Sequence, residues 1–415
     1  MLNILKIFVL LYIFIIHFQV NAFSRNLPES DLPVLENNSI SYLENRLLSE
    51  GFENLVLHIS DHREIIIEYE NRFFRNELTA LSRVFKYASQ LLVSFDTFII
   101  IPKNRNIPIV SIIARQSDIR HFLNREMSEE EFANAITINH GFSKNRNHFF
   151  YNTEQQQNSF LKSDIIIYPG FKAQFSRPGD PAQLQLSLQP TIETPIATGM
   201  QLEAQLNIPF YNEFETTTFS AEFSKVIFNY MMHPFSGQFL SLSIGSFDMG
   251  YKGISCEYAK YFWNGQLALS SKLDYMTRSD SWNTEFKPHY LVKAKYRFPA
   301  VDFTIDAAAG HFLFDDNTWR ISIIRSFGEL DLGFMGIWSK TIGILTGMIV
   351  NIPFPVSRHA APGKFRVIAP NSIPWQYRYL PLNDGYILDT GTEIDSFMKR
   401  LFPSYILNNL HELRN

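Results

Sequence analysis

The sequence is poor in cysteine and in charge. Cys256 is the only cysteine among 415 residues, so the chain has no internal disulfide framework and no cluster of thiolate metal ligands. Charged residues make up 19% of the chain, which is below the roughly 25% that is usual in soluble domains. The net charge of −4 comes without a run of basic residues. This pattern argues against nucleic acid as a partner.

Long apolar runs are missing after the first residues. Residues 1–22 carry a lone Lys6, an apolar run over residues 7–16, and the small-residue end Val20-Asn21-Ala22. This arrangement predicts a cleaved export signal, with an N-terminal membrane anchor as the alternative that the short run disfavours. No later stretch approaches the roughly 20 apolar residues of a spanning helix, so a membrane crossing would require strands.

Catalytic motifs are missing as well. The sequence contains no GxSxG, no HExxH and no phosphate-binding loop. His233, His289 and His311 lie in or near expected strands without a nucleophile motif. His140 and His148 stand in a polar stretch, where a linker is the alternative to a metal site. We therefore expect no catalytic activity, no cofactor and no metal site.

The sequence is instead rich in alternating polar and apolar residues between positions 164 and 354. Gln201, Glu203 and Gln205, for example, interleave with apolar neighbours such as Leu202 and Leu206. Successive side chains of a strand point to opposite faces, so each segment exposes one face to water and hides the other. The 38 phenylalanines and 18 tyrosines fit the aromatic girdles of a lipid-facing surface. The pattern predicts a mainly β protein with an antiparallel transmembrane β-barrel that has a wet interior.

The predicted organisation has four parts after the export signal. Residues 23–138 are expected to form a small periplasmic α/β domain with two helix-strand-strand units, and residues 139–163 a polar linker. Residues 164–354 are expected to form the barrel, and residues 355–415 a C-terminal cap or tail. About twelve strands are expected, near residues 164–175, 182–191, 198–209, 217–232, 238–247, 250–263, 265–277, 285–298, 301–313, 317–327, 330–340 and 342–354.

Several short motifs resemble those of the YjbH/GfcD family of bacterial outer-membrane proteins, in their order along the chain. They are the segments at residues 47–55 and 67–72, Tyr168-Pro169, Gly199 ahead of Pro209, and the segments at residues 253–258, 310–315 and 325–328. Typical members are much longer and carry two barrels with α/β modules, whereas this chain has material for one of each. The resemblance implies a role in secreting or assembling exopolysaccharide or capsule, alongside a lipoprotein and other periplasmic components. It implies no catalytic activity.

The alternation also predicts which side chains line the interior of the barrel. Lys293, Lys295 and Arg297 form a basic strip on one strand, which is expected to face Asp302 and Asp306 across the next hairpin. Two interpretations stay open: a ladder of ion pairs that fills a narrow barrel, or a strip that contacts a saccharide. Glu257 and Arg325 are expected to pair inside. The complete set of candidate interior, saccharide-contacting residues is Glu203, Gln205, Glu257, Lys272, Asp274, Arg278, Lys287, Lys293, Lys295, Arg297, Asp302, Asp306, Arg320 and Arg325.

These features together predict an outer-membrane protein that helps to secrete or assemble an exopolysaccharide or capsule without catalysis. The expected partners are outer-membrane lipid, the polysaccharide, and periplasmic or lipoprotein components of the export system. Two other classes remain as alternatives. A general porin would pass small solutes through an open interior, and a surface structural or adhesion protein would carry long outward loops.

Overall fold

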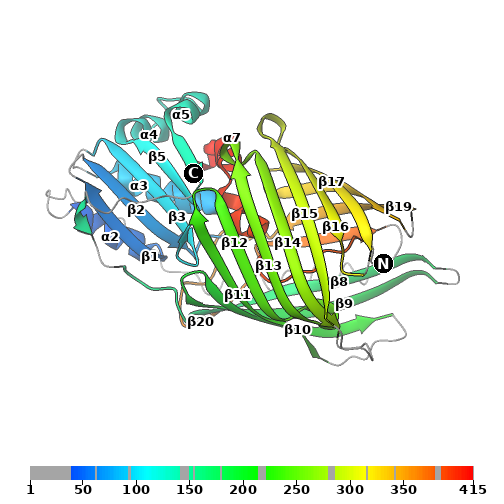
Figure 1. The fold of residues 1–415 in the computed structure, drawn as a ribbon. Coiled ribbons are helices and arrows are strands. Elements are labelled where there is room, and N and C mark those ends of the chain that lie inside the picture. Colours follow the sequence, from blue (N-terminus) through cyan, green and yellow to red (C-terminus); the bar gives the residue numbers. More distant parts are fainter. Residues whose placement is uncertain are drawn as a thin grey trace.

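The structure is a computed structural model that describes residues 39–60, 63–91, 95–140, 149–152, 155–177, 180–213, 221–278, 286–314, 316–340, 343–378 and 385–414. The predicted export signal at residues 1–22 lies outside these described residues. The described residues form two sheets, one with seven strands and one with fourteen. Figure 1 shows the two sheets side by side. The segment after the last long strand runs along the inner side of the larger sheet and then between the two sheets.

The seven-stranded sheet and its helices form what we call the α/β unit. Its strand order is β6-β5-β3-β2-β1-β7, with β4 paired to β3, and only β2 and β3 run parallel. Its elements are α2 (Ser39–Ser49), β1 (Phe52–Ser60), β2 (Glu64–Asn71), α3 (Glu77–Ser89), β3 (Thr97–Asn104), β4 (Ile107–Pro108), β5 (Val110–Arg115), α4 (Gln116–Leu123), α5 (Glu129–Ala135), β6 (Thr137–His140) and β7 (Phe149–Asn152). The strands β6 and β7 continue the sheet into the stretch that the sequence predicted as a linker.

Local capping fixes where the helices of the α/β unit begin. The side chain of Asn76 accepts a hydrogen bond from the backbone N–H of Leu78 at 2.8 Å, which satisfies one of the free donors at the start of α3. Ser128 and Glu131 form a capping box at the start of α5. The buried face of α3, which includes Leu81 and Phe85, then packs on the sheet.

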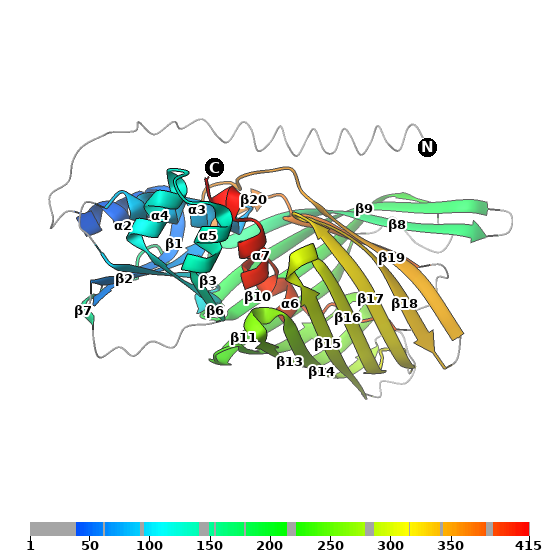
Figure 2. The ribbon, with the colours of Figure 1, turned by 90° about the horizontal axis from the view of Figure 1, so that it is seen from above.

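The larger sheet curls so that one face is concave (Figures 1 and 2), and we call it the curled sheet. Its long strands follow chain order as an antiparallel meander. They are β8 (Ser163–Arg177), β9 (Asp180–Ala197), β10 (Met200–Asn212), β11 (Glu222–Phe235), β12 (Gln238–Ser246), β13 (Tyr251–Phe262), β14 (Leu267–Arg278), β15 (Lys287–Phe298), β16 (Phe303–His311), β17 (Asn317–Phe327), β18 (Leu330–Ser339) and β19 (Gly343–Pro353). Short 3-10 turns, η3 (Asp248–Gly250), η4 (Trp263–Gly265) and η5 (Pro299–Val301), join some of them.

The sheet corrects the predicted closed barrel of about twelve strands in two ways. Its long strands correspond in order to the predicted segments, but two short strands from the tail, β20 (Phe365–Ile368) and β21 (Ser372–Arg378), bring the total to 14. β20 pairs in parallel with β8, and β21 pairs with β19. These two strands end the sheet, which is not closed by pairing between them. The sequence missed β20 because it has four residues and pairs with β8, about half of the chain away. It missed β21, which has seven residues, because the tail was expected only to cap the sheet.

The two faces of the curled sheet differ as the alternation predicts. On β14, Lys272 and Asp274 point to the concave face and are 2% and 5% exposed, whereas Leu273 between them is 57% exposed on the convex face. The same contrast holds on β15 between buried Lys293 and Val292, which is 63% exposed. The outer face is therefore largely apolar and the inner face polar.

Two glycines within the motifs that carry the family resemblance permit close strand contact. Gly253 and Gly310 have φ values of 155° and 152°, a region that side chains with a Cβ rarely adopt. A Cβ at these positions would also collide with the carbonyl oxygens of Tyr275 and Tyr290 on the neighbouring strands.

The C-terminal segment enters the curled sheet and then ends against the α/β unit. It contains α6 (Ile394–Met398), η6 (Lys399–Leu401), α7 (Pro403–Asn408) and η7 (Leu410–Arg414). Residues 385–402, which we call the plug segment, run along the concave face, and α7 lies between the sheet and the α/β unit (Figure 2). Beyond them, Ser82 of α3 donates a hydrogen bond to the carbonyl of Leu413 at 2.9 Å. The final turn thus belongs to the core of the α/β unit.

Changing Leu410 to Ala is expected to destabilise the α/β unit by about 2–5 kcal/mol, because it leaves a cavity in a packed core. Leu410 is fully buried, whereas Leu407 on the preceding turn is 36% exposed. Leu407→Ala is therefore the matched control. Hydrogen exchange of α3 amides measures the effect, and equal protection in both variants would contradict the packing described here.

Candidate functional site

Ion pairs connect the concave face to the plug segment. The ammonium of Lys225 on β11 lies 2.6 Å from a carboxylate oxygen of Glu203 and 2.8 Å from one of Asp389. The ammonium of Lys272 donates to the carbonyl of Leu388 at 2.7 Å and lies 3.9 Å from Glu393. Each lysine therefore joins the sheet wall to the plug segment.

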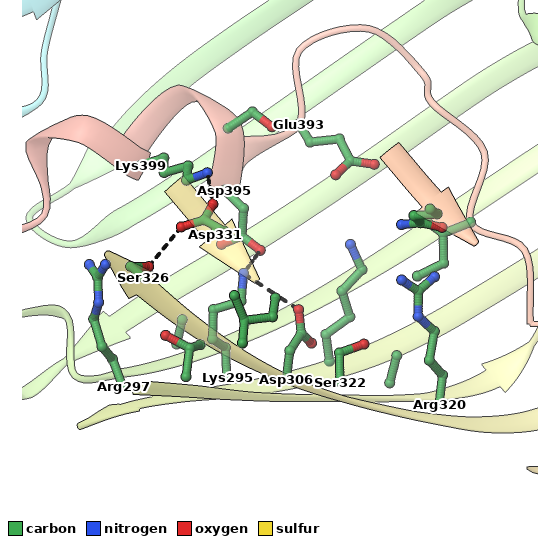
Figure 3. Close-up of a pocket in the computed structure, with 18 of the residues that line it drawn as sticks. Lys295, Arg297, Asp306, Arg320, Ser322, Ser326, Asp331, Glu393, Asp395 and Lys399 are labelled. Carbon is green, nitrogen blue, oxygen red and sulfur yellow. Dashed lines mark hydrogen bonds and ion pairs between the residues drawn. The ribbon is translucent and has the colours of Figure 1, made fainter. Parts of the chain in front are cut away.

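The predicted basic strip on β15 joins the same network. Lys293 lies 3.5 Å from Glu257 on β13. Lys295 lies 2.6 Å from Asp395 of α6 and 3.5 Å from Asp306 on β16, and Figure 3 shows it between these two carboxylates. Arg297 instead donates a hydrogen bond to the hydroxyl of Ser404 at 3.3 Å. The two lysines are thus held in ion pairs, as in the ladder interpretation.

The sequence missed the carboxylates of the plug segment. Asp389, Glu393 and Asp395 pair with wall lysines, but the tail was expected only to cap the sheet. Their close spacing, in a polar and glycine-containing stretch beyond the basic strands, was the available signal. Lys399 of the plug segment also pairs with Asp331 on β18 (Figure 3), and neither residue was predicted.

The other predicted residues fall into different places. Gln205 and Asp274 lie on the concave face, where Gln205 donates to the hydroxyl of Thr191 at 2.8 Å. Arg278 and Lys287 are exposed at the ends of their strands. Asp302 forms no ion pair with the basic strip: it follows η5, acts on Arg297 only from beyond ion-pair distance, and accepts a hydrogen bond from Asn408 at 2.8 Å. The turn there directs its carboxylate to α7.

The predicted pairing of Arg325 with Glu257 is wrong. Arg325 is exposed, and its guanidinium lies over the ring of Phe327 at 5.0 Å. The adjacent apolar residues Ile323 and Ile324 break strict alternation, which is typical of a β-bulge. However, β17 pairs with β16 and β18 without a register shift. Without a bulge, Arg325 keeps the parity of Trp319 and points to the convex face.

A cavity of about 350 Å³ lies between β14–β18 and the plug segment. Its lining includes Lys295, Asp306, Arg320 and Ser322 from the wall and Asp395 from α6 (Figure 3). A second cavity, of about 650 Å³, lies at the junction with the α/β unit and shares Arg297, Asp331 and Lys399 with the first. Polar space therefore continues from the junction into the interior beside the plug segment.

His140, considered above as a metal ligand, is buried at the junction. Its ring stacks on Tyr261 of β13, with 5.2 Å between the ring centres, and meets Phe402 edge-on. Burial lowers the pKa of His140 to about 4 from its ordinary value of 6.5. His148 lies outside the described residues. Among the residues that are described, no three His, Cys, Asp or Glu side chains gather as a metal site would need.

The junction around His140 is expected to lose stability as the pH falls. Because the pKa is lowered, His140 takes up a proton at a higher pH in the unfolded state than in the folded state. Its contribution to the free energy of unfolding is therefore fully present above about pH 6.5 and is lost as the pH falls to about 4. The decline should reach about 3 kcal/mol, as measured by thermal unfolding across this range. His140→Phe keeps an aromatic ring and should make the decline shallower, leaving the part due to buried His359, whose pKa is also lowered to about 4. His121→Phe, at an exposed histidine, should leave the profile unchanged. Identical profiles for the native protein and His140→Phe would refute this role.

The two faces of the curled sheet indicate the class of protein, a β protein that faces lipid on its outside. A curled sheet with an apolar outer face and a charged inner face has the two surfaces of a lipid-facing β protein with a polar interior. No helix in the described part of the chain has the length and apolar character that a membrane crossing needs.

The family model YjbH, described as exopolysaccharide biosynthesis protein YbjH, matches residues 19–334, and the chain belongs to this family. The match confirms the resemblance found in the sequence motifs. Among solved structures, the chain is similar to the outer membrane channel DcaP of Acinetobacter baumannii, with a TM-score of 0.28 and 9% identity, covering 53% of this chain and 98% of that one. No curated protein matches the chain.

Proposed function

We propose that the chain is a bacterial outer-membrane protein that assists the secretion or assembly of an exopolysaccharide or capsule and catalyses no reaction itself. The observation that carries this proposal is the match of residues 19–334 to the exopolysaccharide family. The two-faced sheet supports it, because an apolar exterior suits lipid and a charged interior suits a hydrated polymer. In this role the chain is exported by its N-terminal signal, and residues 39–152 face the periplasm, where lipoprotein or other export partners dock.

The plug segment argues against the alternative of a general porin. Its carboxylates pair with Lys225 and Lys295 of the wall, and its apolar residues Leu388 and Ile394 are buried within the interior. An interior occupied in this way suits a pathway that opens on demand rather than a permanent pore. The described connections are short, as in the Gly328-Glu329 turn between β17 and β18, which counts against a surface adhesin.

Deleting the gene in its native host is expected to lower extracellular polysaccharide severalfold, because the family role places this protein on the export route. The measurement is the amount and sugar composition of polymer in the medium and on the cell surface. Complementation with the native gene should restore both. An unchanged amount and composition in the deletion strain would remove the basis of the proposed function.

A further inference from the structure

The interior cavity beside the plug segment holds more basic than acidic groups. Six basic side chains line it, Lys293, Lys295, Arg297, Arg320, Arg378 and Lys399, against the four carboxylates Asp306, Asp331, Glu393 and Asp395. The three lysines have carboxylate partners within the ion-pair distance: Glu257 for Lys293, Asp306 and Asp395 for Lys295, and Asp331 for Lys399. The other positive charges of the lining belong to the arginines.

Arg320 and Arg297, which line the cavity, form no ion pair with a carboxylate of the described residues. Figure 3 shows both rising from the floor of the cavity, one at each end of a row that contains Lys295, Asp306 and Ser322. Both arginines are paired to β16, which lies between their strands. Arg320 pairs with Ala308 and Arg297 with Thr304, so the two arginines are four positions apart along the strand direction. Four residues of a strand span about 13 Å, so the two guanidiniums mark the ends of an elongated site.

We propose that this cavity binds carboxylate-bearing sugar residues of the exported polymer, with the Arg320 guanidinium as the contact to the sugar carboxylate. The planar fork of donors on arginine matches a carboxylate with two parallel hydrogen bonds. Thr304, Ser322 and Gln376, which also line the cavity, offer hydroxyl and amide groups to the sugar hydroxyls. The cavity of about 350 Å³ lies within the range of small-molecule sites. The inference rests on the proposed function and names the chemical class of its polymer.

A neutral polymer fits the same cavity less well. It would satisfy hydrogen bonds but leave the guanidinium of Arg320 without a directly paired carboxylate, because Asp306 and Glu393 act on it only from beyond ion-pair distance. A sugar carboxylate supplies that charge without displacing the ion pairs of Lys293 and Lys295. Acidic sugars are therefore favoured over neutral ones at this site.

The test uses the purified full-length protein in detergent micelles and titration calorimetry with trigalacturonate. Its fully methyl-esterified form is the matched neutral probe. The acid should bind roughly tenfold or more tightly than the ester, because a charged hydrogen-bonded pair is worth more than a neutral one. Arg320→Gln should reduce the affinity for the acid to that for the ester. Arg325→Gln, a control on the same strand but on the convex face, should bind the acid like the native protein.

Three results would overturn the inference: equal affinity for acid and ester, no binding of either, or an equal loss in Arg320→Gln and Arg325→Gln. If Arg320→Gln does not assemble, Arg320→Lys takes its place. That variant keeps the charge without the fork and should bind the acid more weakly than the native protein, and native-like binding would contradict the proposed contact. A negative result here combined with polymer loss in the deletion strain would reject the acidic-sugar site and leave the secretion role standing.

Discussion

Changing Lys293 and Lys295 together to Gln is expected to prevent correct assembly of the curled sheet. The two substitutions leave the carboxylates of Glu257, Asp306 and Asp395 without their cations in the interior. Removing one partner of a buried ion pair typically costs about 3–5 kcal/mol, since the remaining charge stays desolvated. The heat-dependent mobility shift of the membrane fraction on semi-native gels measures assembly directly.

Two controls separate the ion-pair ladder from saccharide contact. Arg297→Gln alone should assemble normally, because Arg297 forms no ion pair with a carboxylate among the described residues. The change removes a hydrogen bond to Ser404 and a cation–π contact with Phe402. Adding Glu257→Gln, Asp306→Asn and Asp395→Asn to the lysine double variant should restore assembly, because both sides of the pairs are then neutral. If the lysine double variant assembled normally but exported less polymer, saccharide contact would be the better interpretation of the strip.

Replacing residues 386–398 with an equal number of Gly and Ser residues is expected to open the interior to ions. The replacement removes Asp389, Glu393 and Asp395 together with the apolar residues between them, so the side chains that occupy the concave face are gone. Residues 403–414 are retained, so Leu410 and Leu413 stay in the core of the α/β unit, while Ile394, Phe397 and Met398 of the same apolar cluster are removed. Planar-bilayer recordings should show a steady conductance in the variant and little or none in the native protein.

The matched check on this variant is its assembly, which must be native-like on the same semi-native gels before recording. Equal conductance in the two proteins would mean that the plug segment does not block the path. A conducting native protein would in addition revive the general porin as an alternative.

Alternation along single strands made the long strands and their two faces predictable. The polar and apolar neighbours on β14 and β15 occupy the faces that their parity predicts, because a regular strand leaves no other choice. Parity fails as a guide only where the register shifts. β11 carries such a shift opposite Gln205 and Leu206, whereas the apolar pair Ile323-Ile324 on β17 carries none. Ile324 is an apolar side chain on the concave face, and it made the alternation look interrupted. Arg325 was therefore assigned to the wrong face of the sheet.

The role of the tail could not be read from local patterns. β20 pairs with Ser163–Ile166 across about half of the chain, and its four residues are too few to show a period. The pairing of Asp395 with Lys295, 100 positions earlier, depends on the path of the plug segment through the interior. Such contacts are set by tertiary structure, so a sequence can name the charged residues without showing which of them meet.

The contact of η7 with α3 has a consequence for biogenesis. Ser82 and Leu413, which meet in the core of the α/β unit, are separated by 331 positions, and Leu410 and Leu413 fill space between helices made at the start of translation. A chain that is made N-terminus first therefore cannot complete its first globular unit until nearly all of it has been synthesised. Until Leu410 and Leu413 are in place, the core of the α/β unit exposes apolar surface that chaperones or proteases recognise. Chains that end early are therefore expected to be degraded.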